Sequence, residues 1–214
     1  MKRPPKRSKK AAEAPARRVP LQARSQRRFE SILLAAAELF AANGFDATTM
    51  EAIAARAESS IGSVYQFFPN KRAVFRELAQ RCMAASSELF ADLLKKDIVK
   101  LPWREVVDLF IDGFRELNRR PEITAVWGNL QLYGEFAEED MALQRQFIDA
   151  SAAMFTVWAP DMDEARRHAV ATLVVNAIAI SLGAMTQAKE PRASLLLEET
   201  KRLICRYLAP YFDG

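Results

Sequence analysis

Histidine, cysteine and glycine are scarce in this chain, whose 214 residues include one histidine, two cysteines and seven glycines. The histidine, His168, has only Glu164 at helical ligand spacing, which is too few groups for a zinc site. The sequence also has no Ser/His/Asp signature and no glycine-rich phosphate loop. We therefore expect no metal site, no cofactor and no catalytic residues, which argues against an enzyme.

The shortage of glycine and the lack of alternating strand patterns indicate an all-α protein, since half of the residues are hydrophobic and Ala and Leu are common. Cys82 and Cys205 stand far apart without metal-ligand spacing, so we expect thiols in a reducing compartment rather than a disulfide. No signal-peptide pattern is visible, and the expected location is cytoplasmic. The length suits one large or two small domains.

Positive charge is concentrated at the N-terminus. Residues 1–28 contain eleven Lys or Arg against Glu13 alone, a net +10, so the other residues, 20 basic and 26 acidic, sum to −6. The prolines and the missing apolar periodicity of residues 1–21 predict a disordered basic tail. The tail either increases solubility or adds sequence-independent affinity for phosphates. The second hypothesis predicts a steeper salt dependence of binding.

Residues 48–71, TTMEAIAARAESSIGSVYQFFPNK, predict two short helices joined by a tight turn, followed by the start of a third helix. Thr48 and Glu51 have capping-box spacing, so the first helix is expected to begin at Thr49. Ser60 is placed to cap the second helix, and Asn70 the third.

The second of these helices has two different faces. Its expected buried face consists of Ile61, Val64 and Phe68, at positions i, i+3 and i+7. The opposite face is uncharged and small, with Ser59, Ser63 and Gln66 flanked by Gly62 and Tyr65. A glycine inside a helix costs about 1 kcal/mol relative to alanine, so Gly62 indicates close approach by a partner. Ser63 and Tyr65 can reach phosphates, and Gln66 can pair with adenine in a major groove.

This stretch resembles the helix-turn-helix of the TetR/AcrR family of transcriptional regulators. The matching residues are Thr48, Thr49, Ile53, Ala54, Ala57, Ser60, Gly62, Tyr65, Phe68 and Lys71, and the resemblance covers about residues 25–81. Two positions depart from the family pattern: Glu58 stands where glycine is usual, and Ser59 replaces an apolar residue. Glu58 must therefore adopt a conformation that glycine accepts more easily.

The resemblance implies three segments: the tail (1–21), a DNA-binding domain (22–81, with the helix-turn-helix at 48–67) and a helical effector-binding and dimerisation domain (82–214). Its expected partners are a double-stranded DNA operator, a second copy of the chain and a small-molecule effector. The expected function is ligand-relieved repression at a near-palindrome, with activation remaining possible. The candidate DNA contacts are Thr48, Thr49, Ser59, Ser60, Gly62, Ser63, Tyr65, Gln66 and Lys71.

Apolar periodicity and punctuation by Gly and Pro place the other helices at about residues 25–42, 70–96, 102–118, 122–133, 138–158, 163–187 and 193–209. Aromatic residues are frequent between Trp103 and Trp158, and most of them are expected to be ordinary core. Because the resemblance implies an effector cavity among these helices, the candidates to line it are Phe110, Phe114, Trp127, Gln131, Phe147, Ser151, His168 and Asn176. A capped or solvated role for His168 is nevertheless favoured over a chemical one.

Residues 168–188 contain no Asp, Glu, Lys or Arg, a length that can nominally cross a bilayer. The small and polar residues within it favour a helix buried on several sides over a membrane span. The resemblance implies a homodimer through the last two helices, joined as a four-helix bundle.

Two other classes of protein remain as alternatives. A nonspecific architectural DNA-binding protein would use the tail and would bind an operator and a random duplex about equally. A helical enzyme is less well supported, because the remaining candidate groups are carboxylates whose spacing suggests no catalytic site.

Overall fold

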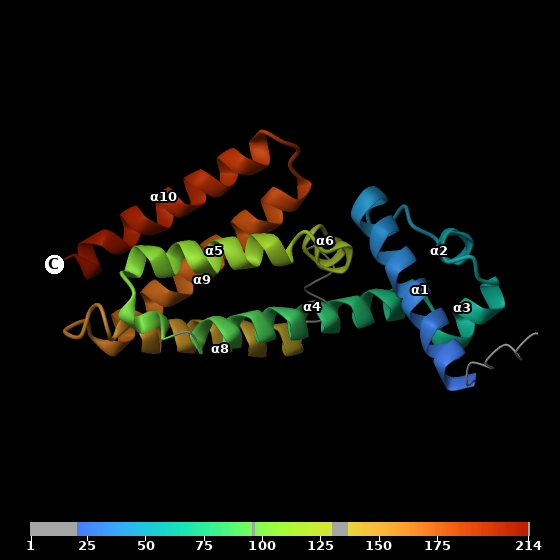
Figure 1. Ribbon diagram of the computed structural model, residues 1–214, viewed down its shortest axis with the longest axis horizontal. Coiled ribbons are helices and arrows are strands. Elements are labelled where there is room, and N and C mark those ends of the chain that lie inside the picture. Colours follow the sequence, from blue (N-terminus) through green and yellow to red (C-terminus); the bar gives the residue numbers. More distant parts are fainter. Residues whose placement is uncertain (1–20, 96, 130–136, 214) are drawn as a thin grey trace, which may run out of the picture.

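The computed structural model describes residues 21–95, 97–129 and 137–213, and every regular element in these ranges is helical (Figure 1). The α-helices are α1 (Leu21–Asn43), α2 (Met50–Arg56), α3 (Ile61–Phe67), α4 (Lys71–Leu94), α5 (Trp103–Leu117), α6 (Pro121–Trp127), α8 (Ala137–Phe155), α9 (Glu164–Gln187) and α10 (Arg192–Phe212), and a short 3-10 helix, η1, spans Ile98–Lys100. The all-α prediction is confirmed. The predicted tail (1–21) lies outside the described residues, apart from its last residue.

At one end of the elongated molecule, α1, α2, α3 and the start of α4 form a unit that we call the head (Figure 1). Its centre is a cluster of three rings, Phe40, Phe45 and Phe75, whose centroids lie 5.4 to 5.8 Å apart. Ile53 of α2 and Val64 of α3 are fully buried in the same core. The apolar stripe of α1 therefore supports the two helices that follow it.

Three side-chain caps fix where the short helices begin. Ser60 Oγ accepts a hydrogen bond from Ser63 N at 3.2 Å, and Asn70 Oδ1 accepts one from Ala73 N at 2.9 Å, which confirms both predicted caps. The predicted cap of the first helix is wrong by one residue. Thr49 is the cap, accepting from Ala52 N at 3.1 Å, and the helix begins at Met50.

Thr48 is only 2% exposed, and its hydroxyl donates to Gly44 O at 2.8 Å. The end of α1 leaves carbonyl groups without helical partners, and Thr48 satisfies one of them. This internal bond explains the shift of the cap.

Glu58 has a φ of +50°, in the left-handed region that favours glycine. The prediction from the family pattern is confirmed: the turn between α2 and α3 keeps its conformation even though a glutamate occupies it. The turn is held by Ser59 N, which donates to Ala54 O at 2.9 Å.

The rest of α4 joins α5, α8, α9 and α10 in a larger unit that we call the body (Figure 1). A second core lies among α5, α8, α9 and α10, with Ile111, Ala171 and Leu208 almost completely buried. The last helix extends beyond the predicted end at residue 209 to Phe212. The ring of Phe212 packs against Trp103, Phe155 and Trp158, at centroid distances of 5.4, 5.1 and 5.8 Å, which favours the extra turn despite Pro210.

Between head and body lies α6, which packs against both α1 and α4. Its residues Ile123, Ala125 and Val126 are fully buried and belong to the same core as the head. The helix ends at Trp127, six residues before the predicted end at Tyr133, and residues 130–136 lie outside the described ranges. The head and the body are thus joined through a shared core as well as through the continuous helix α4.

Candidate functional sites

The outward face of α3 is exposed and carries no charge. Tyr65 is 48% exposed, and Gly62 and Gln66 are exposed beside it. Behind them, Val64 is fully buried, and Phe68 at the end of the helix stacks on Phe29 of α1 with centroids 5.1 Å apart. A rigid core therefore supports α3 from one side and leaves the other side free for a partner.

Ile61, which was predicted to be buried, is 38% exposed. Ile61 occupies the first position of α3, at the edge of the core. Val64 and Phe68 fill the space behind the helix. An exposed apolar residue thus joins Gly62, Tyr65 and Gln66 on the outer surface. Sequence periodicity groups Ile61 with Val64 and Phe68 on one apolar face and gives no signal for this exception.

Most of the predicted hydroxyl contacts have partners within the head. Ser60 Oγ lies 2.9 Å from Ser63 Oγ in addition to capping α3, and Ser63 is half-buried. The side-chain oxygen of Ser59 is buried, and Thr48 is buried as well, so neither hydroxyl lies on the exposed face of the head. Thr49 is exposed, and its hydroxyl hydrogen is still able to donate while the oxygen caps α2.

Lys71, a predicted phosphate contact, makes its hydrogen bonds within the head. Its ammonium group donates to Phe45 O at 2.6 Å, to Thr48 O at 2.8 Å and to Asp46 O at 3.2 Å, and lies 4.3 Å from the centre of the Phe45 ring. These carbonyls belong to the connection between α1 and α2, where no helical N–H is available to them. All three ammonium hydrogens are therefore used to hold this connection.

Replacing Lys71 with methionine is expected to reduce the free energy of unfolding by about 2 kcal/mol, because charge-assisted hydrogen bonds contribute roughly 1.5–3 kcal/mol and the carbonyls would lose their donor. Urea unfolding followed by circular dichroism measures this loss. Lys95→Met is the matched control: its pair with Asp92 is solvent-exposed, so a change below about 0.5 kcal/mol is expected. Equal effects of the two substitutions would contradict the internal role of Lys71.

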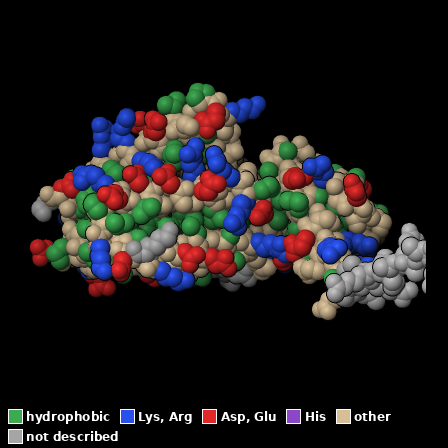
Figure 2. All heavy atoms as spheres, viewed as in Figure 1, with side chains coloured by type: hydrophobic (Ala, Val, Ile, Leu, Met, Phe, Trp, Pro, Cys, Tyr) green, Lys and Arg blue, Asp and Glu red, His purple; other side chains and the backbone are tan. Residues whose placement is uncertain are grey.

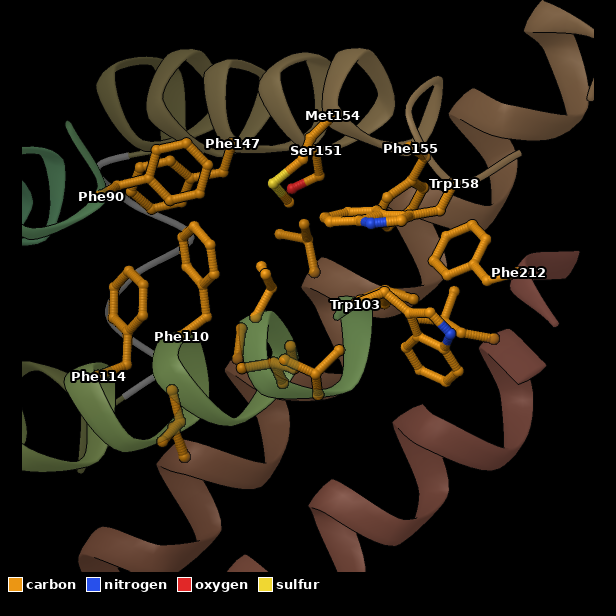
Figure 3. Close-up of a pocket in the computed structure, with 18 of the residues that line it drawn as sticks. Phe90, Trp103, Phe110, Phe114, Phe147, Ser151, Met154, Phe155, Trp158 and Phe212 are labelled. Carbon is orange, nitrogen blue, oxygen red and sulfur yellow. The ribbon is translucent and has the colours of Figure 1, made fainter. Parts of the chain in front are cut away.

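A cavity of about 820 Å³, part of it open to solvent, lies within the body (Figure 3). Five of the eight predicted pocket residues line it: Phe110, Phe114, Trp127, Phe147 and Ser151. They come from α5, α6 and α8, so the structure brings together side chains that are up to 41 positions apart, from 110 to 151. Nine of the described lining residues are aromatic, which makes the walls broad and flat.

Two predicted pocket residues do not line the cavity, and a third, Gln131, lies outside the described residues. His168 is exposed, and its Nε2 lies 3.1 Å from Asp149 Oδ1 on the surface. Asn176 accepts a hydrogen bond from Gln144. It is two positions from Val174 and from Ile178, which line the cavity, so at about 100° per residue it points the other way.

Sequence analysis missed one whole wall of the cavity, formed by Val174, Ile178 and Leu182 of α9. Their i, i+4, i+8 spacing was visible, but the prediction placed only His168 and Asn176 of this helix at the cavity and assigned the rest of its apolar surface to burial and contacts between subunits. It also missed Phe212, which lies beyond the predicted end of the last helix.

Aromatic pairs close the cavity at both ends (Figure 3). At one end Phe90 stacks on Phe147 with centroids 4.5 Å apart, and at the other Trp103 and Trp158 pack around Phe212. The indole N–H of Trp103 donates to Asp213 Oδ1 at 2.9 Å. Arg104, and to a smaller extent Trp103, donates hydrogen bonds that hold the pKa of Asp213 below its ordinary value. The carboxylate therefore stays ionised and fixes the orientation of Trp103 from outside the cavity.

The end of α6 connects the cavity to the head. Trp127 lines the cavity, and two residues later Asn129 Oδ1 accepts a hydrogen bond from Phe45 N at 2.9 Å. The amide nitrogen of Asn129 donates to Ala125 O at 2.7 Å, and Gln187 of α9 donates to Gly128 O at 3.2 Å. A displacement of Trp127 would therefore be transmitted to the loop between α1 and α2.

Substitution of Asn129 by alanine is expected to destabilise the protein by about 1–3 kcal/mol, because the buried N–H of Phe45 would lose its acceptor. Thermal and urea unfolding of Asn129→Ala measure this loss. Asn129→Asp keeps the acceptor for Phe45 N but sets a carboxylate oxygen against Ala125 O, to which the amide nitrogen donates at 2.7 Å, so it is expected to recover little stability. A loss below about 0.5 kcal/mol for alanine would show that this contact does not hold the loop.

Helices α9 and α10 pack against each other, and each leaves large apolar side chains in solvent. Leu173 and Ile180 of α9 are 57% and 69% exposed, and Leu195 and Leu203 of α10 are both 57% exposed. Among the described residues, α9 (Glu164–Gln187) is the one helix that is long enough and apolar enough to cross a membrane. The mean hydropathy of its most apolar stretch is 1.9. One such helix is weak evidence, because the core helix of a soluble protein passes the same test.

Charges of both signs alternate over the body, with apolar side chains between them (Figure 2). Among the described residues no cluster of three His, Cys, Asp or Glu side chains is arranged to hold a metal ion. Neither Cys82, which is buried, nor Cys205, which is half-buried, is in a disulfide.

The chain matches two family models. Residues 32–78 match the bacterial regulatory proteins of the tetR family, and residues 102–208 match the tetracyclin repressor-like C-terminal domain. Among solved structures, a TetR-like transcriptional regulator from Rhodococcus sp. RHA1 is 22% identical with a TM-score of 0.64, over 90% of this chain and 99% of that one. The chain has no significant match among curated proteins.

Two further structures show the same fold. A gamma-butyrolactone receptor described as ArpA-like is 18% identical with a TM-score of 0.62, covering 89% of this chain and 95% of that one. NalD, the secondary repressor of the MexAB-OprM multidrug efflux pump in Pseudomonas aeruginosa, is 22% identical with a TM-score of 0.54, covering 85% and 96%. Because the two family models span the head and most of the body, and the matched structures share the fold, the chain belongs to the TetR family of transcriptional regulators.

Proposed function

We propose that the chain is a homodimeric repressor that binds a near-palindromic DNA operator and leaves it when a small apolar or aromatic effector enters the cavity. TetR-family regulators are ligand-responsive DNA-binding proteins that act as dimers, and they are soluble and cytoplasmic. The observation that carries the proposal for this chain is the exposed, uncharged face of α3, which is supported from behind by a rigid core.

In this proposal residues 22–81 are the DNA-binding domain and residues 82–214 the effector-binding and dimerisation domain. We assign direct DNA contacts to the accessible residues of the head: Thr49, Ser60, Gly62, Ser63, Tyr65 and Gln66. Gln66 would read an adenine edge, and Tyr65 would bind a phosphate. Arg24, Arg27 and Arg28, all exposed at the start of α1, would add attraction to the DNA backbone.

The second copy of the chain would cover the apolar faces of α9 and α10. The exposed side chains Leu173, Ile180, Leu195 and Leu203 provide the surface that such a contact buries. Two heads related by twofold symmetry would then place their α3 helices in successive major grooves, about 34–36 Å apart or at a larger distance compatible with whole turns of the duplex.

The effector would act through the end of α6. A ligand that displaces Trp127 would move Asn129, and through Phe45 it would change the orientation of the head. The ligand shifts the equilibrium only by the difference between its affinities for the two arrangements.

The test is selection of bound sequences from a pool of random duplexes, using the full-length protein. A two-part, nearly palindromic motif is the expected result. A pool that remains random after several rounds, with affinity governed by salt alone, would instead support a nonspecific architectural protein. Binding at stepped salt with and without residues 1–20 then measures how many phosphates the tail contacts.

Gly62 provides a separate prediction, because a Cβ added there meets no atom of the protein within 4 Å. Gly62→Ala is therefore expected to raise the free energy of unfolding, by up to about 1 kcal/mol, while it weakens operator binding. Urea unfolding and fluorescence anisotropy with the selected duplex measure the two effects. Unchanged DNA affinity in a stabilised variant would show that no partner approaches this helix closely.

A further inference from the structure

The cavity in the body has no ionisable side chain among its described lining residues. The nearest ion pair, Arg104 with Asp213, lies behind Trp103: Arg104 stacks over the indole at 4.1 Å and is paired with Asp213 at 2.9 Å. The positive charge of Arg104 and the negative charge of Asp213 thus neutralise each other, and neither is offered to a ligand. A charged ligand in the cavity would therefore lose its hydration without gaining a counter-charge, which is strongly unfavourable.

Among the lining residues that the structure describes, one hydroxyl interrupts the apolar surface. Ser151 is 7% exposed, and its oxygen points into the cavity beside Met154 (Figure 3). Within the described part of the chain this hydroxyl makes no side-chain hydrogen bond. Buried polar groups in proteins are nearly always paired, and a buried hydroxyl that faces an open space is therefore a place for a polar group of a ligand.

The position of Ser151 along the cavity adds a constraint on shape. The Phe90 and Phe147 rings lie on one side of it, and the Trp158 and Phe212 rings lie on the other (Figure 3). A ligand that reaches the hydroxyl with its polar group would thus need an apolar part on each side. A molecule with a charged head group at one end does not fit this arrangement.

We propose that the cavity selects an uncharged, ring-containing molecule whose single polar group lies between two apolar parts and hydrogen-bonds Ser151. This deepens the proposed function, on which it rests, by naming the chemical class of the effector. The flat aromatic walls favour planar groups through stacking. Ser151 sets the register of the ligand, and the absence of a counter-charge excludes anions and cations of the same shape.

The experiment uses two fluorescent probes with the same skeleton. N-phenylnaphthylamine is neutral, with one N–H between its two ring systems, and anilinonaphthalenesulfonate adds a negative charge. Titration of the full-length protein is expected to show at least about tenfold tighter binding of the neutral probe, since each 1.4 kcal/mol of unfavourable charge burial corresponds to a factor of ten. Equal or tighter binding of the sulfonate overturns the proposal, as does binding of neither probe.

Two variants localise the effect. Ser151→Ala is expected to weaken the neutral probe by about three- to tenfold, the range of one hydrogen bond. It should leave unchanged the affinity for benzylnaphthalene, in which CH₂ replaces the N–H, when that affinity is calculated from competition with the measured probe affinity of each variant. Ala179→Trp fills the cavity from α9 and is expected to abolish binding, with circular dichroism as the check on folding. A probe that binds Ala179→Trp as well as wild type, or Ser151→Ala as well as wild type, contradicts the proposal.

Binding to the selected duplex is measured on the same protein. If the duplex is bound selectively but the probes show no preference for the neutral form, this inference fails and the proposed function stands. If no duplex is selected while the preference for the neutral probe holds, the proposed function fails. The inference that the cavity binds uncharged, ring-containing molecules then stands.

Discussion

Ile180→Glu is expected to convert the proposed dimer to a monomer and to reduce affinity for the full operator by at least about 100-fold, because linked binding sites commonly gain factors of 10²–10⁴ over single ones. Ile180 is the most exposed large apolar side chain of α9, at 69%. A glutamate there would place two negative charges near the twofold axis of an apolar contact, without counter-ions. Within one protomer the residue already faces solvent, so the fold of the chain is not expected to depend on it.

Sedimentation equilibrium determines the mass, which for one chain is 24.1 kDa. Leu203→Glu tests the same interface from α10. Val157→Glu is the matched control, because Val157 is also an exposed apolar residue, 49% accessible, but lies between α8 and α9. A dimeric Ile180→Glu variant with wild-type operator affinity would place the contact between subunits elsewhere.

Gln66→Ala is expected to cost about 1–3 kcal/mol per half-site, the discrimination that one bidentate contact to a base provides. Since symmetry doubles the loss, affinity for the selected operator should fall by roughly 30-fold or more, with relaxed preference at one base pair in each half. Affinity for random duplex should hardly change. Repeating the selection with this variant shows directly which base pair is affected.

A substitution of Tyr65 distinguishes contacts to DNA phosphates from contacts to bases. Tyr65→Phe removes only the hydroxyl and is expected to weaken binding to all duplexes by a similar factor, because phosphate contacts carry no sequence information. Gln146→Ala, an exposed glutamine on α8, is the control for both. If Gln66→Ala discriminates operator from random duplex as well as wild type does, α3 does not read bases through this residue.

The local sequence was sufficient to predict the helix-turn-helix. Ser60 and Asn70 cap their helices as their positions predicted, and Val64 and Phe68 lie on the buried face. These features depend on residues within one or two turns of each other, so spacing along the chain specifies them. The left-handed conformation of Glu58 was predicted from the resemblance to the family, in which glycine is usual at this position.

Long-range packing gives several of the predicted site residues partners within the protein that the sequence does not show. Thr48 and Lys71 matched a binding motif, but the carbonyls of the connection between α1 and α2 take up their donors. Which donors such carbonyls find depends on where α4 passes, and a pattern within one helix does not contain that information. His168 and Asn176 were misplaced because their helix face is defined only by its neighbours.

The sequence by itself determined the helical class, the caps Ser60 and Asn70 and the uncharged outer face of α3, since periodicity states which side of each helix is apolar. The sequence did not determine which other element, cavity or solvent lies against each apolar face. In α9 one face lines a cavity, another packs on α8 and α10, and Ile180 faces solvent. Only the tertiary structure distinguished these surfaces, because burial depends on elements far away in the chain, and only it joined Trp127 and Asn129 into a connection between cavity and head.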